Sequence, residues 1–163
     1  MKKAKEYPFY TVRQKRLSLT VDNVSGFEIP SYERFFNWIF EAMSEECSYA
    51  TIGLLLCGVS QARYYNRVYR DKDYATNILS FPLALHEESR LRGDLIICPE
   101  VVQREAHEQN KILRSHYAHL LVHGVLHLMG YEHVEDDEAE VMESKEISIL
   151  HRMGYQNPYL EDK

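Results

Sequence analysis

The sequence has few cysteines, no long apolar run and no sign of a secretory leader. Its 163 residues include three cysteines, Cys47, Cys57 and Cys98, and none of them forms a C-x-x-C pair. An odd, scattered set argues against a disulfide framework and predicts reduced, buried thiols. The most apolar stretch, residues 120–129, is interrupted by two histidines, so we expect no membrane partner. No apolar run follows the lysines at the N-terminus, which predicts a cytoplasmic protein.

Internal repeats, low-complexity tracts and Gly/Ser-rich linkers are also missing, which predicts one domain over residues 1–163. The formal net charge is −6, so we expect no DNA partner. The charge is uneven, because residues 132–146 hold eight acidic side chains while bases cluster elsewhere. One basic cluster contains Arg63, Arg67, Arg70 and Lys72. Such a cluster either binds a polyanion or is an ordinary solvated face, and composition leaves both interpretations open.

Apolar periodicity predicts strands interleaved with helices. The strands are expected over residues 17–21, 51–57, 76–81 and 95–98. Helices are expected from an N-cap at Ser31 to about 43, from a cap at Ser60 to 69, and over 99–109, 115–129 and 136–153, with 86–92 as a loop. This order predicts an α+β fold with a mixed sheet of about four strands packed with helices. The helix over 115–129 is apolar nearly all round, so we expect it to be central and buried.

Histidine is concentrated in one region, because five of the eight lie on this central helix or just after it. His119, His123 and His127 recur every four residues, so they share one helix face and allow two metal-binding pairs. A straight helix cannot easily supply a third ligand to the same ion. Gly130 allows the chain to turn sharply, and His133 follows that turn. We therefore predict a metal site at His123, His127 and His133, with His119 packing or hydrogen-bonding nearby.

Three protein ligands leave a fourth position open, as in catalytic metal sites. The three imidazoles suit zinc, although copper, nickel and iron also accept them. The pattern H-x-x-x-H-x-x-G-x-x-H is also that of metzincin proteases, in which glutamate follows the first histidine and serves as general base. Here that position is Gly124. Its lack of a carboxylate argues against peptide hydrolysis by that route.

Three stretches resemble the YbeY family of ribosomal-RNA maturation endoribonucleases. Residues 123–133, HGVLHLMGYEH, are similar to the family signature H-G-x-L-H-L-x-G-Y-D-H. Residues 69–82, YRDKDYATNILSFP, and residues 93–100, GDLIICPE, resemble two further family stretches in the same order. One departure is Glu132, where the family usually has aspartate. If that carboxylate orients a ligand histidine, its geometry differs slightly here.

The resemblance implies a single-strand-specific endoribonuclease that trims the 3′ end of small-subunit (16S) ribosomal RNA and acts in ribosome quality control. It implies a single zinc ion at the three histidines, with ribosomal RNA and the ribosome as partners. By the same resemblance, Arg70 matches an arginine that serves the reaction or binds RNA phosphate. A hydrolase of another substrate, such as a peptide, and a non-catalytic ribosome-associated factor remain the alternatives.

Parts of the chemistry stay open at this level. Asp73, Asp94 and Glu132 are equal candidates for a general base. The nucleophile is either water or the RNA 2′-hydroxyl. A group of tyrosines near Arg70 offers stacking platforms for bases or, alternatively, ordinary packing surfaces. These are Tyr64, Tyr65, Tyr69 and Tyr74.

Overall fold

The computed structural model describes residues 8–83 and 89–160, and its centre is a four-stranded mixed sheet. The strands are β1 (Leu17–Asn23), β2 (Tyr49–Leu56), β3 (Ile78–Pro82) and β4 (Arg90–Ile97). Their order is β1-β2-β4-β3, in which β1, β2 and β4 are parallel and β3 pairs antiparallel with β4. The predicted α+β fold with a mixed sheet is confirmed.

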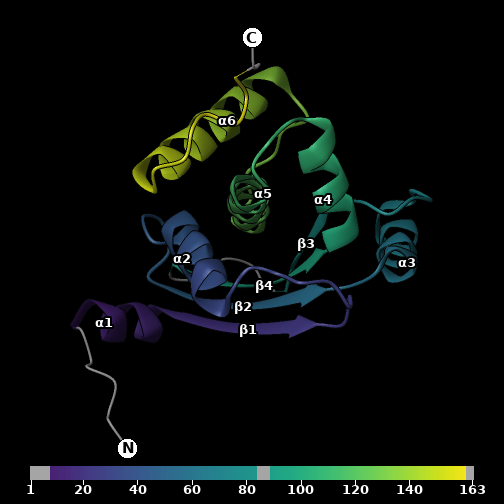
Figure 1. The fold of residues 1–163 in the computed structure, drawn as a ribbon. Helices are drawn as coiled ribbons and strands as arrows, with labels where there is room; N and C mark the ends of the chain where they lie inside the picture. Colours follow the sequence, from purple (N-terminus) through teal and green to yellow (C-terminus); the bar gives the residue numbers. More distant parts are fainter. Residues whose placement is uncertain (1–7, 84–88, 161–163) are drawn as a thin grey trace, which may run out of the picture.

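Helices cover this sheet unevenly (Figure 1). They are α1 (Pro8–Arg16), α2 (Tyr32–Met43), α3 (Val59–Arg70), α4 (Pro99–Glu108), α5 (Leu113–Leu128) and α6 (Asp136–Arg152). In Figure 1, α5 lies in the middle, with α2, α4 and α6 around it and the sheet beneath. Among the described residues, no helix is both long enough and apolar enough to cross a membrane.

The central position of α5 follows from its sequence. Its apolar side chains are buried on nearly every side, and they form one core with α2, α6 and the inner face of the sheet. A second, smaller core lies where α3 and α4 meet the ends of the strands, and two of the cysteines belong to it. All three cysteines lie among the described residues, are buried as predicted, and form no disulfide there.

Three local predictions were wrong. Helix α1 was not predicted, because its apolar residues do not recur clearly at helical spacing. Arg16 at its end donates hydrogen bonds to the carbonyls of Ser44 and Cys47 at 2.7 and 2.8 Å, which hold the helix in place. The expected loop over residues 86–92 is strand from Arg90 onward, because exposed arginines alternate there with buried positions; residues 86–88 lie outside the described residues. Helix α3 begins after Gly58 rather than at a Ser60 cap.

Candidate metal centre

Helix α5 and the turn after it bring three histidines together. His123 and His127 stand one turn apart on α5, and Gly130, at φ +100°, reverses the chain so that His133 returns to them. The backbone N–H groups of Gly130 and Tyr131 close the helix by donating to the carbonyls of His127 and Leu126, both at 3.0 Å. Ligand nitrogens of the three histidines all lie within 4.8 Å of one another. The predicted glycine turn therefore produces the expected cluster.

The returning segment is fastened to the turn that follows α2. The Tyr131 hydroxyl donates to the two carboxylate oxygens of Glu46 at 2.8 and 2.9 Å. The ammonium of Lys145 on α6 pairs with the same carboxylate at 3.2 Å. Because Tyr131 stands two residues before His133, this network limits where the third imidazole can lie.

The nitrogen atoms fit a zinc ion. Nδ1 of His123 lies 2.6 Å from Oε1 of Glu146, so its Nε2 is left to face the other histidines. That Nε2 lies 3.0 Å from Nε2 of His127. Two nitrogens each about 2 Å from a common tetrahedral ion lie about 3.3 Å apart, close to this separation. Histidine ligands of metals usually donate their second ring N–H to a carboxylate, as His123 does here.

The electrostatics also suit a cation. Burial, together with repulsion from His123 and His133, lowers the pKa of His127 to about 4. His127 is therefore neutral near pH 7, which is the form that binds a metal.

Glu146 contacts the histidine cluster, and the sequence interpretation missed it. Its carboxylate is only 1% exposed, and it accepts hydrogen bonds from His123, His119 and Tyr159. Burial opposes its ionisation, but these hydrogen bonds outweigh burial and lower the pKa of Glu146 to about 2. A signal was present, because Met142, Glu146 and Ile149 share the buried face of α6. An acid on an apolar stripe needs a buried partner.

His119 lies one turn before His123, as expected, and belongs to this carboxylate. Its Nε2 lies 2.8 Å from Oε2 of Glu146. His119, His123 and Glu146 form a second group whose spacing would allow a metal. We call this group closed, because Glu146 is buried and its Oε2 also accepts a hydrogen bond from Tyr159. All three members of the first group line one cavity.

That cavity contains the predicted arginine. It has a volume of about 190 Å³, and Arg70 and Lys72 line it together with the three histidines. Arg70 is the last residue of α3, which ends at Asp71 in the left-handed conformation. The buried Asn66 amide donates to the Tyr74 carbonyl at 2.8 Å and holds the following segment against α3. The structure thus brings Arg70 and the three histidines, distant in sequence, to one hollow.

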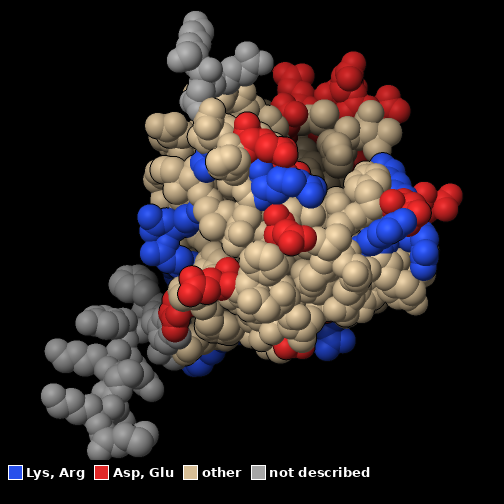
Figure 2. Space-filling view, turned by 45° about the vertical axis from the view of Figure 1, so that its right-hand side comes forward, with Lys and Arg blue, Asp and Glu red and all other residues tan. Residues whose placement is uncertain are grey.

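Charge is divided around this region. Figure 2 shows acidic side chains gathered at the top, where α6 begins, and basic side chains at the right, where α3 lies. The acids include the first turn of α6, directly after the returning segment: Asp136, Asp137 and Glu138. The cavity therefore receives its positive side chains from α3 and the residues just after it.

Gly124 is fixed by packing. A Cβ at this position would lie 2.7 Å from Cδ1 of Ile78 and 3.1 Å from Cδ2 of Leu95. The Gly124 carbonyl also accepts a hydrogen bond of 3.0 Å from the hydroxyl of Ser80 on β3. This face of α5 is pressed onto the sheet. A glutamate here would have to bury its carboxylate between helix and strand, so the protease arrangement does not fit.

Comparisons with known proteins show which family this chain resembles. A model of the family described as Endoribonuclease YbeY matches residues 20–154. A Neisseria gonorrhoeae protein called Endoribonuclease YbeY is 51% identical, over 99% of this chain and 99% of its own length. A Pseudomonas fluorescens protein of the same name is 43% identical, over 90% of this chain and 99% of its own length. This chain belongs to the YbeY family. The YbeY family and the endoribonuclease class, both predicted from the sequence motifs, are confirmed.

The YbeY assignment agrees with the fold. The solution structure of TM1509 from Thermotoga maritima matches with a TM-score of 0.56 at 18% identity. The match covers 88% of this chain and 99% of that one. At this identity the likeness concerns the fold alone.

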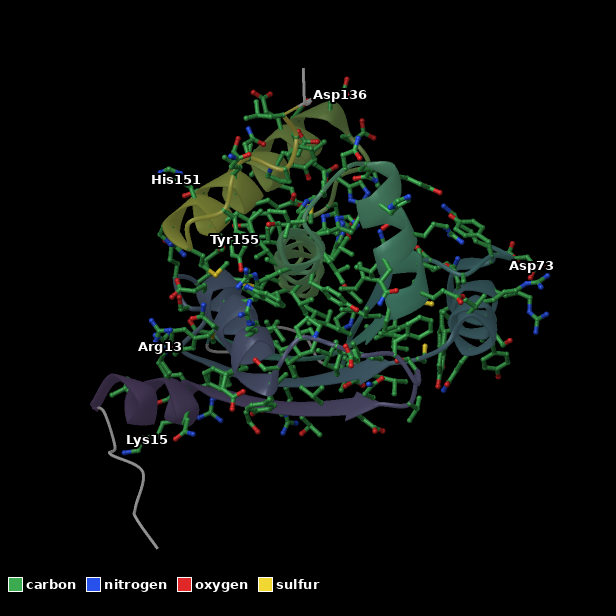
Figure 3. All side chains as sticks on the ribbon, viewed as in Figure 1. Arg13, Lys15, Asp73, Asp136, His151 and Tyr155 are labelled. Carbon is green, nitrogen blue, oxygen red and sulfur yellow. The ribbon has the colours of Figure 1, made fainter. Side chains whose placement is uncertain are left out.

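The three carboxylates suggested as a general base for this YbeY chain lie in different places. Asp73 is paired with Arg63 at 2.8 and 3.0 Å, and Figure 3 shows it at the outer edge beyond α3. Asp94 lies on the sheet face opposite α5, because its neighbours Gly93 and Leu95 face that helix. Glu132 is exposed and close enough to His127 to raise the pKa of that imidazole. Of the three, only Glu132 remains beside the histidines.

The tyrosines divide in a similar way. Tyr65 and Tyr69 stack on each other with ring centres 6.3 Å apart, and Tyr69 meets Phe81 edge-on at 5.0 Å. They line a separate groove on the outer sheet face. Tyr74 is exposed and lines the histidine cavity. Tyr65 and Tyr69 thus pack on each other away from the histidines, but Tyr69 is 62% exposed, so the stacking interpretation stays a prediction for Tyr69 as well as for Tyr74.

Proposed function

We propose that residues 1–163 form one metal-dependent endoribonuclease domain specific for single-stranded RNA. The proposed role is 3′-end maturation of small-subunit (16S) ribosomal RNA and ribosome quality control in the cytoplasm. Membership of the YbeY family supports the reaction class. The observation that carries the site assignment is the cavity in which His123, His127 and His133 face Arg70.

In this proposal the three histidines hold one zinc ion. All-nitrogen donors suit zinc among the available metals. When bound, zinc supplies Lewis acidity to phosphate chemistry. Glu146 fixes the tautomer of His123 by accepting its Nδ1–H, and the turn anchored by Tyr131 and Glu46 holds His133.

Arg70 binds the scissile phosphate. Its planar guanidinium matches two phosphate oxygens at once and neutralises charge that builds during transfer. Arg70 makes no ion pair within residues 8–83 and 89–160, whereas Arg63 on the same helix is occupied by Asp73. Lys72 adds a second cation to the cavity. Tyr74 offers its ring to an unpaired base, which favours single strands over duplex.

The two alternative functions are less well supported. Peptide hydrolysis with the protease type of base is opposed by the packing at Gly124. A purely structural metal is opposed by the cavity beside the three histidines, since structural sites are closed by a fourth protein ligand.

The test incubates the purified protein with single-stranded RNA, double-stranded RNA and a casein-type protein, each with and without a chelator. We expect cleavage of single-stranded RNA that stops on chelation and returns with zinc. His127→Ala removes a proposed ligand, and Arg70→Ala removes the proposed phosphate contact. Intact RNA in the wild type, or cleavage that survives both chelation and His127→Ala, would overturn the proposal.

Two matched control variants test whether a loss of RNA cleavage is specific to the proposed site residues. Arg63→Ala changes an arginine on the same helix that is paired away from the cavity. His151→Ala removes an exposed histidine, which Figure 3 places at the far end of α6. Both variants are expected to cleave RNA at nearly the wild-type rate.

A further inference from the structure

The chain after α6 folds back and places a tyrosine on the metal centre's carboxylate. The Tyr159 hydroxyl donates to Oε2 of Glu146. Its ring also meets the ring of His119 edge-on, with centres 5.3 Å apart. Tyr159 lies five residues beyond Gly154, where the match to the family model ends. The histidine motifs therefore give no indication of this contact.

The segment carrying Tyr159 (residues 154–160, the tail) is held at several points. Trp38 Nε1 on α2 donates to the Tyr155 hydroxyl at 3.0 Å, and Figure 3 shows Tyr155 on the side of α6 that faces α2. Lys111 Nζ donates to the Pro158 carbonyl at 3.1 Å. The Tyr159 N–H donates to Oδ1 of Asn157 at 2.9 Å. These contacts hold the backbone that leads up to Tyr159, and its hydroxyl is placed against Glu146.

Glu146 divides its two oxygens between two tasks. Oε1 accepts from Nδ1 of His123, and Oε2 accepts from His119 and from Tyr159. A carboxylate group is rigid and planar, so a donor that fixes one oxygen also fixes the direction of the other. The position of Oε1, and with it the ring of His123, thus depends on what holds Oε2.

The Tyr159 hydroxyl is suited to this task. Burial and the adjacent Glu146 carboxylate raise the pKa of Tyr159 above its ordinary value, so the hydroxyl stays protonated and remains a donor. A buried carboxylate needs donors for its lone pairs, and losing one leaves part of that demand unmet.

We propose that Tyr159 is a positioning residue of the metal centre, which acts through Glu146 to orient His123. The proposal rests on the proposed function in that it assigns His123 a metal. Tyr159 touches neither the three-histidine cavity nor Arg70.

The test measures zinc affinity by competition with a chromophoric chelator, in the full chain. Loss of an outer-shell partner of a histidine ligand weakens metal binding about 10–100-fold. Tyr159 acts one contact further out, so we expect Tyr159→Phe to weaken zinc binding about tenfold. Glu146→Gln, which alters the carboxylate itself, is expected to weaken it more.

Tyr155→Phe is the matched control. It makes the same chemical change in the same tail, but its hydroxyl contacts Trp38 instead of Glu146. We expect its zinc affinity to stay within about twofold of wild type. A second readout uses the metal-free protein: the Nδ1–H proton of His123, observed by NMR, should exchange faster with water in Tyr159→Phe than in Tyr155→Phe.

The outcomes separate the two proposals. If Tyr159→Phe binds zinc as wild type does while Glu146→Gln binds it weakly, the role of Tyr159 is wrong and the metal site stands. If Tyr159→Phe and Tyr155→Phe weaken zinc binding equally, the tail affects the site only by covering it. The proposal that Tyr159 positions His123 is then refuted. If the wild type binds no zinc, or His127→Ala binds it normally, the proposed metal site fails and takes the role of Tyr159 with it.

Discussion

The histidines of α5 and the turn after it fall into two sets that differ in their partners. His116, His119 and His123 each face a buried or half-buried carboxylate, Glu105 or Glu146. His127 and His133 hydrogen-bond to no carboxylate within residues 8–83 and 89–160, and both line the cavity that contains Arg70. His123 belongs to both sets, because its Nδ1 faces the Glu146 carboxylate and its Nε2 faces His127.

This difference teaches how one residue type serves two purposes on one helix. A carboxylate completes the hydrogen bonding of a histidine and fixes its tautomer, whereas imidazoles left facing one another have lone pairs to offer a cation. The closed set is therefore suited to orientation and the open set to binding. Each prediction below tests whether this division is real.

The largest expected effect separates His127 from His119. His127→Ala removes a ligand from the open set, so zinc affinity should fall by more than about 100-fold, beyond the range of an outer-shell loss. His119→Ala removes one donor from Glu146, and its loss should be about tenfold or less. Chelator competition measures both. A larger loss in His119→Ala than in His127→Ala would place the metal in the group of His119, His123 and Glu146 instead, and equal losses would contradict the division into two sets.

The next effect separates metal binding from phosphate binding within the open cavity. Arg70→Ala should lower the rate of RNA cleavage about 10²–10³-fold, because it removes one charged contact to the transition state. Zinc affinity should hardly change, since Arg70 is no ligand in the proposal. Cleavage assays paired with metal titration check this. Arg63→Ala serves as the control, and an equal loss there would mean that α3 contributes only general positive charge.

The sequence predicted the open set but not the carboxylates that hold the closed one, for a physical reason. A spacing of four residues and a glycine turn are local, so the chain itself reports that His123, His127 and His133 converge. Arg70 came only from the family motif, because β3, β4 and α4 separate it from the histidines along the chain. Glu146 and Tyr159 reach the site through packing of α6 and the tail on α5, which no local pattern encodes. Strand β4 was predicted too short for a related reason, since its exposed arginines imitate a loop.

A smaller effect is expected where the open set rests on the sheet. In Gly124→Ala the new Cβ would overlap Cδ1 of Ile78, and such overpacking costs about 1–3 kcal/mol. Replacing glycine by alanine within a helix returns about 1 kcal/mol, so we expect a net loss of about 0–2 kcal/mol in the free energy of unfolding. Urea denaturation measures it. Ile78→Val removes the overlapping atom, so the double variant should be more stable than additivity predicts; strict additivity would contradict the contact.

The smallest effect concerns the pair of Glu105 and His116, neither of which lines the cavity of the three histidines. Burial opposes ionisation of Glu105, but hydrogen bonds from His116 and Asn77 lower its pKa below the ordinary value. A carboxyl whose pKa is lower in the folded chain stabilises the fold above its unfolded pKa, and this stabilisation disappears as pH falls through the folded pKa. Glu105→Gln keeps the shape and loses the charge, so we expect a loss of about 1 kcal/mol or less near neutral pH. The difference from wild type should shrink as pH falls below the ordinary glutamate pKa and through the lower pKa of the folded chain, where the wild-type carboxyl takes up its proton. Urea unfolding across that pH range measures the difference in the free energy of unfolding. If this difference stays constant with pH, His116 needs only a hydrogen-bond acceptor. In that case it differs from His123, whose partner Glu146 is charged.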